Sequence, residues 1–130
     1  MARTFFYRGK TVDQLQAMKP DEFTSLIKAR GRRAIKRNGI LYKRLLAKID
    51  HMKKAGVTKP VRTHVREAVI LPAWVGMSFA VYDGKQYQEM RIAPEMIGHR
   101  LGEYVYTVKR VVHSAPGIRA TRGSKFLAVK

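Results

Sequence analysis

The chain has no cysteine among its 130 residues, so it can form neither a disulfide framework nor a metal site built on thiolates. It has no His-Glu-x-x-His motif, no carboxylate pair at metal-binding spacing, and no phosphate-binding glycine loop followed by Lys-Ser or Lys-Thr. No segment approaches the ~20 apolar residues of a membrane span, and the first residues lack the apolar run of a signal peptide. We therefore expect no metal, no cofactor and no membrane-spanning segment.

Acidic residues are also scarce: the chain has nine Asp and Glu against 27 Lys and Arg, which gives a formal net charge of +18. The excess is uneven, because residues 1–60 carry a net +12, residues 61–94 a net +1 and residues 95–130 a net +5. A near-neutral centre between basic ends is typical of a folded core whose periphery meets a polyanion. Nucleic acid is therefore favoured as the partner over an anionic membrane surface or an acidic protein.

Residues 1–60 are predicted to form a basic helical N-terminal arm. Near its start, three aromatic side chains lie among bases at positions 5–7. Such rings can stack on unpaired nucleobases of a nucleic acid or pack on the protein's own helices, and the sequence favours neither interpretation. The spacing of Val12 and Leu15 then predicts a short helical turn.

A longer helix is predicted to begin at Pro20, because proline suits the first helical position and acids follow it, and to end at Asn38-Gly39. Six bases and no acid occur from residue 28 to residue 37, so this run is predicted to meet phosphates. Gly31 weakens the helix by about 1 kcal/mol relative to alanine, and the clustered like charges weaken it further. We expect RNA contact to help hold it.

Ile40 to Lys54 is predicted to form a second amphipathic helix. Its apolar stripe runs from Leu41 through Leu45 and Ile49 to Met52, with bases off the stripe. The two long helices are predicted to form a hairpin around the Asn-Gly pair between them.

A loop from Gly56 to Pro60 separates the arm from a predicted core, residues 61–113. Glu67 to Leu71 is predicted to be the first strand of this core, and Trp74 to pack inside it. With the hairpin that follows, this gives a three-stranded sheet, which needs a helix on one face to bury it. The predicted fold class is α+β.

The hairpin is predicted from two strand patterns, Phe79 to Tyr82 and Lys85 to Ile92. Asp83-Gly84 between them suits a two-residue turn with positive φ at both positions. After the hairpin, Pro94-Glu95 favours a short helical turn, and Gly98 favours a left-handed residue that ends it.

From residue 114 onward, no strand or helix pattern remains. Residues 118–130 carry four bases and no acid, with too few apolar side chains to form a core. Residues 114–130 are therefore predicted to be an extended, flexible basic C-terminal tail.

The segment Met96–Tyr104, Met-Ile-Gly-His-Arg-Leu-Gly-Glu-Tyr, resembles the signature of the universal small-subunit ribosomal protein family S-nineteen. The resemblance is strong from about Val61 to the C-terminus, and the helical region before it resembles the archaeal and eukaryotic branch. The chain departs from the family at Asp83, Arg119 and Ala128, where the family usually has Asn, Gly and Pro. Further matching pieces are Thr63–Arg66, Ile70–Pro72, Val75-Gly76, Asp83–Lys85, Pro116–Ile118 and Ala120–Arg122.

This resemblance implies a structural, non-enzymatic constituent of the head of the small ribosomal subunit, in the cytoplasm. Contact with ribosomal RNA is expected to combine neutralisation of phosphates with recognition of folded RNA by its shape. The resemblance further implies a neighbouring protein of the S-thirteen family, an intersubunit bridge to the large subunit, and a tail close to the decoding region and its tRNA.

Other functions remain open from the residues alone. A metal-free ribonuclease could use His64, His99 and His113 as general acid and base. Another RNA- or DNA-binding architectural protein would also fit the charge, although no helix-turn-helix, zinc-finger or basic-zipper spacing occurs.

The predicted RNA-binding residues come from the basic run of the arm, from segments that resemble the family, and from the tail. In the alternating stretch from residue 61 to residue 66, every second side chain should share one side, which would put its bases together. The predicted residues are Lys28, Arg30, Arg32, Arg33, Lys36, Arg37, Arg62, Thr63, His64, Arg66, Lys85, His99, Arg100, Arg119, Arg122 and Lys125.

Overall fold

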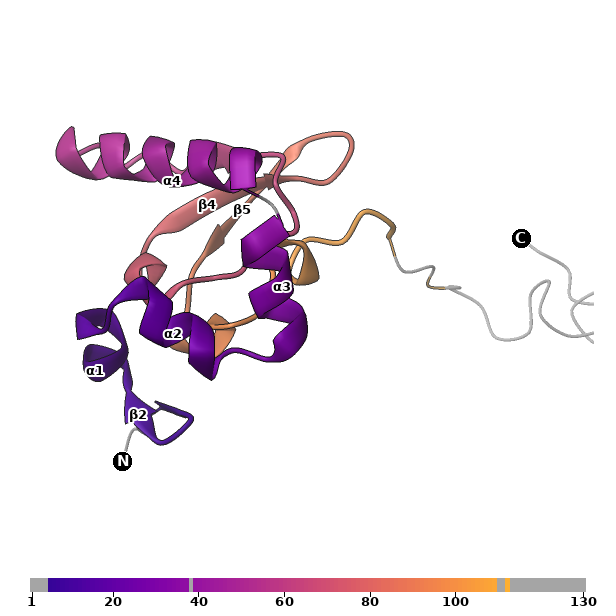
Figure 1. The fold of residues 1–130 in the computed structure, drawn as a ribbon. Coiled ribbons are helices and arrows are strands. Elements are labelled where there is room, and N and C mark those ends of the chain that lie inside the picture. The colour runs from indigo at the N-terminus through magenta and orange to yellow at the C-terminus, as the bar shows by residue number, and fades with distance from the viewer. Residues whose placement is uncertain (1–4, 38, 110–111, 113–130) are drawn as a thin grey trace, which may run out of the picture.

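The computed structural model describes residues 5–37, 39–109 and 112. This part of the chain has four helices, a three-stranded sheet and a two-stranded ribbon (Figure 1), so the predicted α+β class is confirmed. The strands are β1 (Phe6–Tyr7), β2 (Lys10–Thr11), β3 (Val61–Thr63), β4 (Ser78–Tyr82) and β5 (Tyr87–Arg91). The helices are α1 (Val12–Ala17), α2 (Pro20–Leu26), α3 (Ala29–Arg37) and α4 (Gly39–Lys54), with 3-10 turns η1 (Pro72–Trp74), η2 (Pro94–Met96) and η3 (Leu101–Glu103).

The three-stranded sheet has the order β3-β4-β5, with β3 parallel to β4 and β4 antiparallel to β5. Helix α4 runs along it (Figure 1), as the need to bury one face of a small sheet predicts. Val61, Phe79 and Val81 of this sheet are buried together with Leu45 and Ile49 of α4. This first cluster is the main core of the protein.

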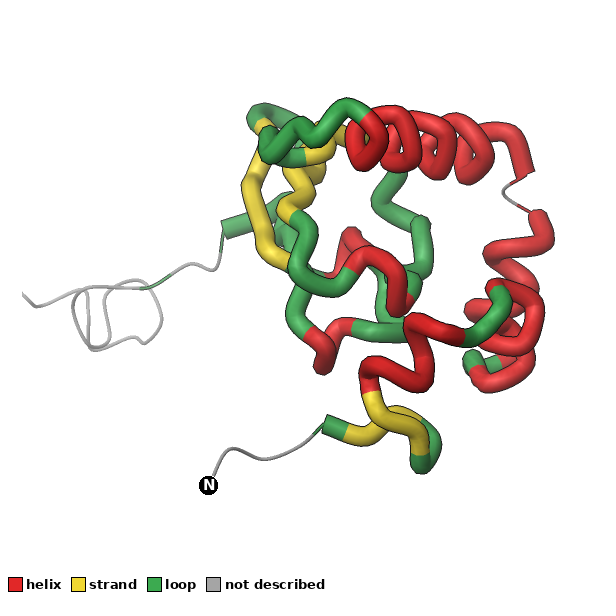
Figure 2. The backbone as a smooth tube through the Cα atoms, turned by 90° about the vertical axis from the view of Figure 1, so that its left-hand side faces the viewer, coloured by secondary structure: helices red, strands yellow, loops and turns green. Residues whose placement is uncertain are grey.

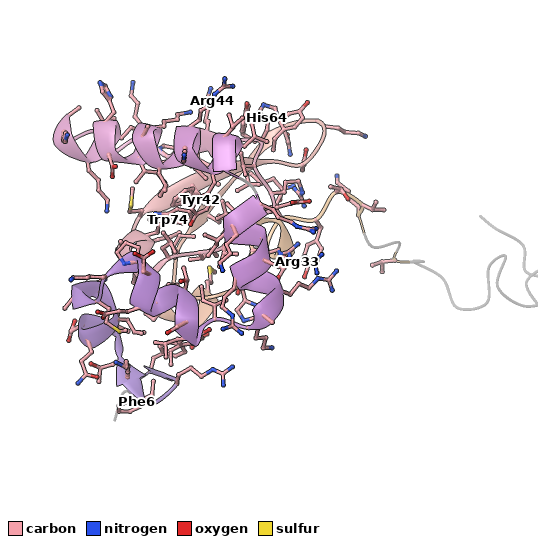
Figure 3. All side chains as sticks on the ribbon, in the orientation of Figure 1. Phe6, Arg33, Tyr42, Arg44, His64 and Trp74 are labelled. Atoms are coloured by element: carbon pink, nitrogen blue, oxygen red, sulfur yellow. The ribbon has the colours of Figure 1, made fainter. Side chains whose placement is uncertain are left out.

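Trp74 is the largest fully buried side chain of this core, with 1% of its surface exposed, which confirms the predicted packing. Its ring centroid lies 5.3 Å from that of Phe79 and 6.3 Å from that of Tyr42, distances at which tilted aromatic pairs attract. Figure 3 shows Tyr42 and Trp74 between α4 and the rest of the fold. Leu41, predicted on the same apolar stripe, is instead 56% exposed, because Tyr42 occupies the buried position next to it.

A second cluster joins the N-terminal helices to the segment that carries the family signature. Leu15, Phe23 and Ile27 are buried there against Val69 and Ile97. Of the three aromatic residues near the start, Phe5 and Tyr7 pack on this cluster. The third, Phe6, is 59% exposed to solvent. The packing interpretation therefore holds for two of the rings, and the stacking interpretation stays open for the third.

The predicted single helix from Pro20 to Asn38 is wrong, because the chain divides it into α2 and α3. Ile27 ends α2 with an extended backbone, φ −74° and ψ 152°, and its side chain lies in the second cluster. Burial of Ile27 therefore overrides continuation of the helix. The predicted helical hairpin is also wrong: α3 and α4 meet at a corner in both views (Figures 1 and 2).

The predicted first strand, Glu67 to Leu71, is wrong as well, since the strand that pairs with β4 is β3. The backbone of residues 66–70 pairs instead with the signature segment. Ile70 N–H donates to the carbonyl of His99 at 2.8 Å, and Gly98 N–H donates to that of Ile70 at 3.1 Å. The signature is therefore held by backbone hydrogen bonds along its length.

The hairpin is confirmed, but its turn is longer than the predicted two residues, because Tyr82 pairs with Tyr87. Asp83 makes the difference: its Oδ1 accepts hydrogen bonds from the backbone N–H groups of Lys85 (2.7 Å) and Gln86 (2.8 Å), as turn-forming aspartates do. These bonds hold the pKa of Asp83 below its ordinary value. Only Gly84 in this turn has positive φ, 109°.

Candidate nucleic-acid interface

Helix α3 carries most of the predicted RNA-binding bases. None of its nine residues is buried, and it rests on the protein through the half-buried Ala34 and Ile35. Its five bases are exposed, and none has a side-chain hydrogen-bond partner among the described residues. Figure 3 shows one of them, Arg33, on the outer side of the helix. The bases are Arg30, Arg32, Arg33, Lys36 and Arg37, and the exposed Lys28 comes just before them.

Four arginines come together around a shallow hollow of about 380 Å³, which we call the arginine hollow. Arg30, Arg33 and Arg37 share one face of α3, since side chains three and four positions apart are neighbours on a helix. Arg100, from the signature segment, joins them, and Glu67 also lies there. The structure thus brings two separately predicted groups of residues onto one surface with a net positive charge.

Next to it lies a second cavity of about 330 Å³, which we call the apolar pocket. Its floor is made by Ile27, Val69 and Ile97, each no more than 4% exposed. Five charged or polar residues also line the pocket, and because all but the half-buried Arg100 are exposed, we place them at its mouth: Lys28, Arg30, His99, Arg100 and Glu103. Arg30 and Arg100 line both cavities, so the two form one continuous surface.

Gly31 keeps the apolar pocket open on the side of α3. A Cβ atom at this position would overlap Cγ2 of Ile27, so no larger residue fits without moving the floor. On the opposite side, Gly98 has φ 81°, as predicted, and a Cβ atom there would lie 2.6 Å from the hydroxyl of Tyr7. The glycine that the sequence marked as a helix weakener is therefore explained by close packing.

His99 and Glu103 form a hydrogen-bonded pair at the mouth of the apolar pocket. Nδ1 of His99 lies 2.7 Å from Oε2 of Glu103, and about half of each side chain is exposed. The ring of Tyr104 also packs edge-on against His99. Burial of Tyr104, together with Glu103 and Glu95 nearby, raises the pKa of its hydroxyl. His99 is therefore oriented by the protein before any partner binds.

Arg66, predicted to bind RNA, has a role inside the protein. Its Nη1 donates to the carbonyl of Tyr82 at 2.8 Å, and its Nη2 donates to the carbonyls of Gly102 (3.1 Å) and Val105. This half-buried guanidinium ties the end of β4 to η3 and the residues after it. It therefore does not share the outward side of Arg62, as the alternating pattern predicted, because β3 ends at residue 63.

A patch of rings and bases covers the outward face of the sheet. The guanidinium of Arg62 lies 5.5 Å from the ring centroid of Tyr87, within the range of a cation–π contact. His64 Nε2 lies 2.6 Å from the hydroxyl of Tyr87, and its ring lies 4.5 Å from that of Tyr82. The two tyrosines were missed from the sequence, although the register of the hairpin places both on this face. We call Arg62, His64, Tyr82 and Tyr87 the aromatic patch.

The structure gives less evidence on RNA binding by the remaining predicted residues. Thr63 is buried, and its Oγ1 accepts a hydrogen bond from Val65 N–H at 3.0 Å, so it has a structural role. Lys85 is exposed in the turn of the hairpin. Arg119, Arg122 and Lys125 lie outside the described residues.

The described residues offer little for a catalytic or metal site. Among residues 5–37, 39–109 and 112, no three His, Asp or Glu side chains are grouped to hold a metal ion. Within the same residues, none of the helices has the length and apolar character that crossing a bilayer requires. His64 and His99, considered for a ribonuclease, have no contact with each other and different partners, and His113 lies outside the described residues.

Comparison with known proteins identifies the family. A family model described as "Ribosomal protein S19" matches residues 32–113. The protein "Small ribosomal subunit protein uS19" of Saccharolobus solfataricus is 48% identical over 130 residues, covering 98% of this chain and 93% of that protein. The protein of the same name from Metallosphaera sedula is 45% identical over the same shares of both chains. The family model spans the aromatic patch and part of both cavities, and the two relatives align with nearly the whole chain. These matches show that the chain belongs to the ribosomal protein S19 family.

Proposed function

We propose that this protein is a structural constituent of the small ribosomal subunit, acting in the cytoplasm, and that it holds ribosomal RNA mainly through α3 and the arginine hollow. Its role is architectural and not enzymatic. The observation that carries the proposal is the convergence of four arginines, three from α3 and Arg100 from the family signature, on one surface. Family membership supports the assignment to the subunit, and the convergence of arginines supports the proposed RNA contact.

The electrostatics of α3 support this contact. Its five exposed bases, with no acid in the helix, repel one another along its surface. Phosphates would neutralise this charge and release condensed counterions, which is the main source of salt-dependent affinity for nucleic acids. Lys36 and Arg37 in the last turn interact favourably with the helix dipole, so the helix can form before RNA arrives.

The aromatic patch is proposed as a second RNA contact. Exposed aromatic rings can stack on unpaired nucleobases whatever their sequence, and basic side chains beside the rings can bind phosphates. Arg62 and Tyr87 already contact each other, so the patch is ordered in advance and binding fixes fewer rotamers. Because Arg66 is engaged with three carbonyl oxygens, Arg62 is the arginine of this region that we propose for RNA.

The central test compares two sets of three exposed bases in neighbouring helices. The triple variant Arg30→Gln, Arg33→Gln, Arg37→Gln should weaken binding to small-subunit ribosomal RNA and reduce the slope of log affinity against log salt by about 3. For the unchanged protein, contact with roughly 6–10 phosphates predicts a ~10³–10⁵-fold loss of affinity between 50 and 200 mM salt.

The matched control is Lys43→Gln, Arg44→Gln, Lys54→Gln in α4, where all three bases are exposed. It removes the same charge, so a general electrostatic attraction would respond equally to both triples. An equal loss of affinity in the two variants would show that net charge, not the arginine hollow, holds the RNA. Circular dichroism should confirm that both variants keep the fold.

The finer placement in the subunit is proposed from the family resemblance. It includes a position in the head, a neighbour of the S-thirteen family, a bridge to the large subunit, and a basic tail near tRNA at the decoding region. A chain truncated after Ala115 should still enter the subunit but lower its affinity for tRNA. Reconstituted subunits allow both measurements: failed incorporation would make the tail an assembly anchor, and unchanged tRNA affinity would contradict its proposed position.

A further inference from the structure

We infer that the apolar pocket is a site for one unpaired nucleotide of the RNA, with the base inserted between α3 and the signature segment and its phosphates held at the mouth. The inference rests on the proposed function and adds a mode of recognition to it. A surface that only neutralised phosphates would need the arginine hollow but no cavity with an apolar floor beside it.

The shape and lining of the pocket suit a base. Its volume of about 330 Å³ falls at the lower end of the range for small-ligand sites. Three buried aliphatic side chains, Ile27, Val69 and Ile97, line its inner end, so the flat face of a base would lie against apolar groups. Bases that are splayed out of a stack are recognised in this way, by apolar contact on their faces and hydrogen bonds on their edges.

The charge around the mouth suits the phosphates on either side of that base. Lys28, Arg30 and Arg100 lie at the mouth, and the last two also line the arginine hollow. A strand that runs along α3 can therefore place one base in the pocket while its next phosphates meet Arg33 and Arg37. This continuity favours a nucleotide of a polymer over a small apolar metabolite, which would gain nothing from the arginines.

Glu103 gives the pocket a means of choosing among bases. Its Oε2 is held by His99, while its Oε1 has no hydrogen-bond partner among the described residues. A carboxylate only accepts hydrogen bonds, and each of its oxygens can accept two, so Oε1 and the remaining lone pair of Oε2 can receive the two adjacent N–H donors on the pairing edge of guanine. We therefore assign guanine as the preferred base, with Glu103 as the residue that determines this preference.

The test uses the full chain with ¹³C-labelled isoleucine and valine methyl groups, titrated with the four nucleoside 5′-monophosphates and, as the control without a base, ribose 5-phosphate. The methyl signals of Ile27, Val69 and Ile97 should shift with the nucleotides, saturating on the order of 1–10 mM. Ile49, buried in the other cluster, is the internal reference and should not move. Ribose 5-phosphate should leave all these signals in place.

Variants distinguish recognition of the nucleobase from recognition of the phosphate. Arg100→Gln should weaken binding of every nucleotide several-fold, whereas the matched change Lys43→Gln on α4 should not. Guanosine monophosphate should bind most tightly, and Glu103→Gln should abolish its advantage. Equal shifts with ribose 5-phosphate, or shifts confined to residues outside the floor, would overturn base insertion. Equal affinity for all four nucleotides would overturn the role of Glu103.

These experiments distinguish failure of base insertion from failure of the proposed function. If the chain binds ribosomal RNA through its α3 arginines but the floor methyls never respond to nucleotides, base insertion fails and phosphate binding stands. If the floor responds but the α3 triple variant binds RNA normally, the pocket stands and the arginine hollow is not the main contact.

Discussion

Helices α3 and α4 follow each other in the chain and are both rich in bases, yet the protein uses them differently. Helix α4 buries three residues and directs two of its lysines at the protein itself. Lys48 Nζ donates to the carbonyl of Arg62 at 2.6 Å, and Lys53 Nζ donates to that of Ala73 at 3.0 Å. Helix α3 buries no residue and leaves all its bases to solvent.

A high density of basic residues therefore does not by itself leave a helix exposed to a partner. What separates the two is the opposite face: α4 covers the sheet with Leu45 and Ile49, whereas α3 has only half-buried Ala34 and Ile35 at the edge of the clusters. Most helical stability in proteins comes from packing of an apolar face. Helix α3 therefore has more to gain from an external partner than α4.

The largest expected effect compares one isoleucine from each helix. Ile49→Ala should lower the free energy of unfolding by about 3–4 kcal/mol, because Ile49 is 1% exposed at the centre of the core and its removal leaves a cavity. Ile35→Ala in α3 should cost about 1–2 kcal/mol, since its side chain is only half-buried. Urea denaturation followed by circular dichroism measures both. Equal losses would mean that the protein holds α3 as firmly as α4.

A second comparison applies the same distinction to two arginines. Arg66→Ala should cost about 2–3 kcal/mol of stability, because it leaves three backbone carbonyls without their charged donor. Arg62→Ala, which removes an exposed guanidinium above Tyr87, should change stability by less than about 0.5–1 kcal/mol. RNA affinity should respond in the opposite order. If Arg66→Ala keeps its stability but loses RNA affinity, its assignment to the protein interior is wrong.

The sequence predicted the elements whose signals are local. Proline and acids placed the start of α2, the apolar stripe placed α4, and Asp83-Gly84 placed the turn of the hairpin. The position of Trp74 in the core followed from its surroundings in the chain. The run of basic residues from 28 to 37 likewise coincides with the exposed bases of α3 and with the exposed Lys28 just before it.

What could not be predicted depends on contacts between distant segments. The break at Ile27 exists because its side chain packs against Val69 and Ile97, which lie far along the chain. Residues 67–71 have a strand pattern, but their backbone partners are in the signature segment and not in the sheet. Arg66 has the alternation of an outward base, and only the fold reveals the three carbonyls that it binds.

The smallest expected effect concerns an unpaired buried hydroxyl in α4, the helix that packs against the sheet. The hydroxyl of Tyr42 is buried and has no hydrogen-bond partner among the described residues, a state that costs about 1–3 kcal/mol. Tyr42→Phe should therefore raise the free energy of unfolding, by about 1 kcal/mol once the small cavity left by the oxygen is counted. Burial raises the pKa of Tyr42 above the ordinary tyrosine value of about 10, so only the unfolded chain ionises at this residue when the pH rises past that value. The unchanged protein therefore loses stability as the pH rises above about 10, and the Phe variant, which has no hydroxyl to ionise, should lose stability less steeply in that range. Denaturation curves for both proteins from pH 7 to pH 11 measure the two effects. If Tyr42→Phe is less stable at pH 7, the hydroxyl has a partner in solution, such as a buried water, and the packing of α4 has no such flaw.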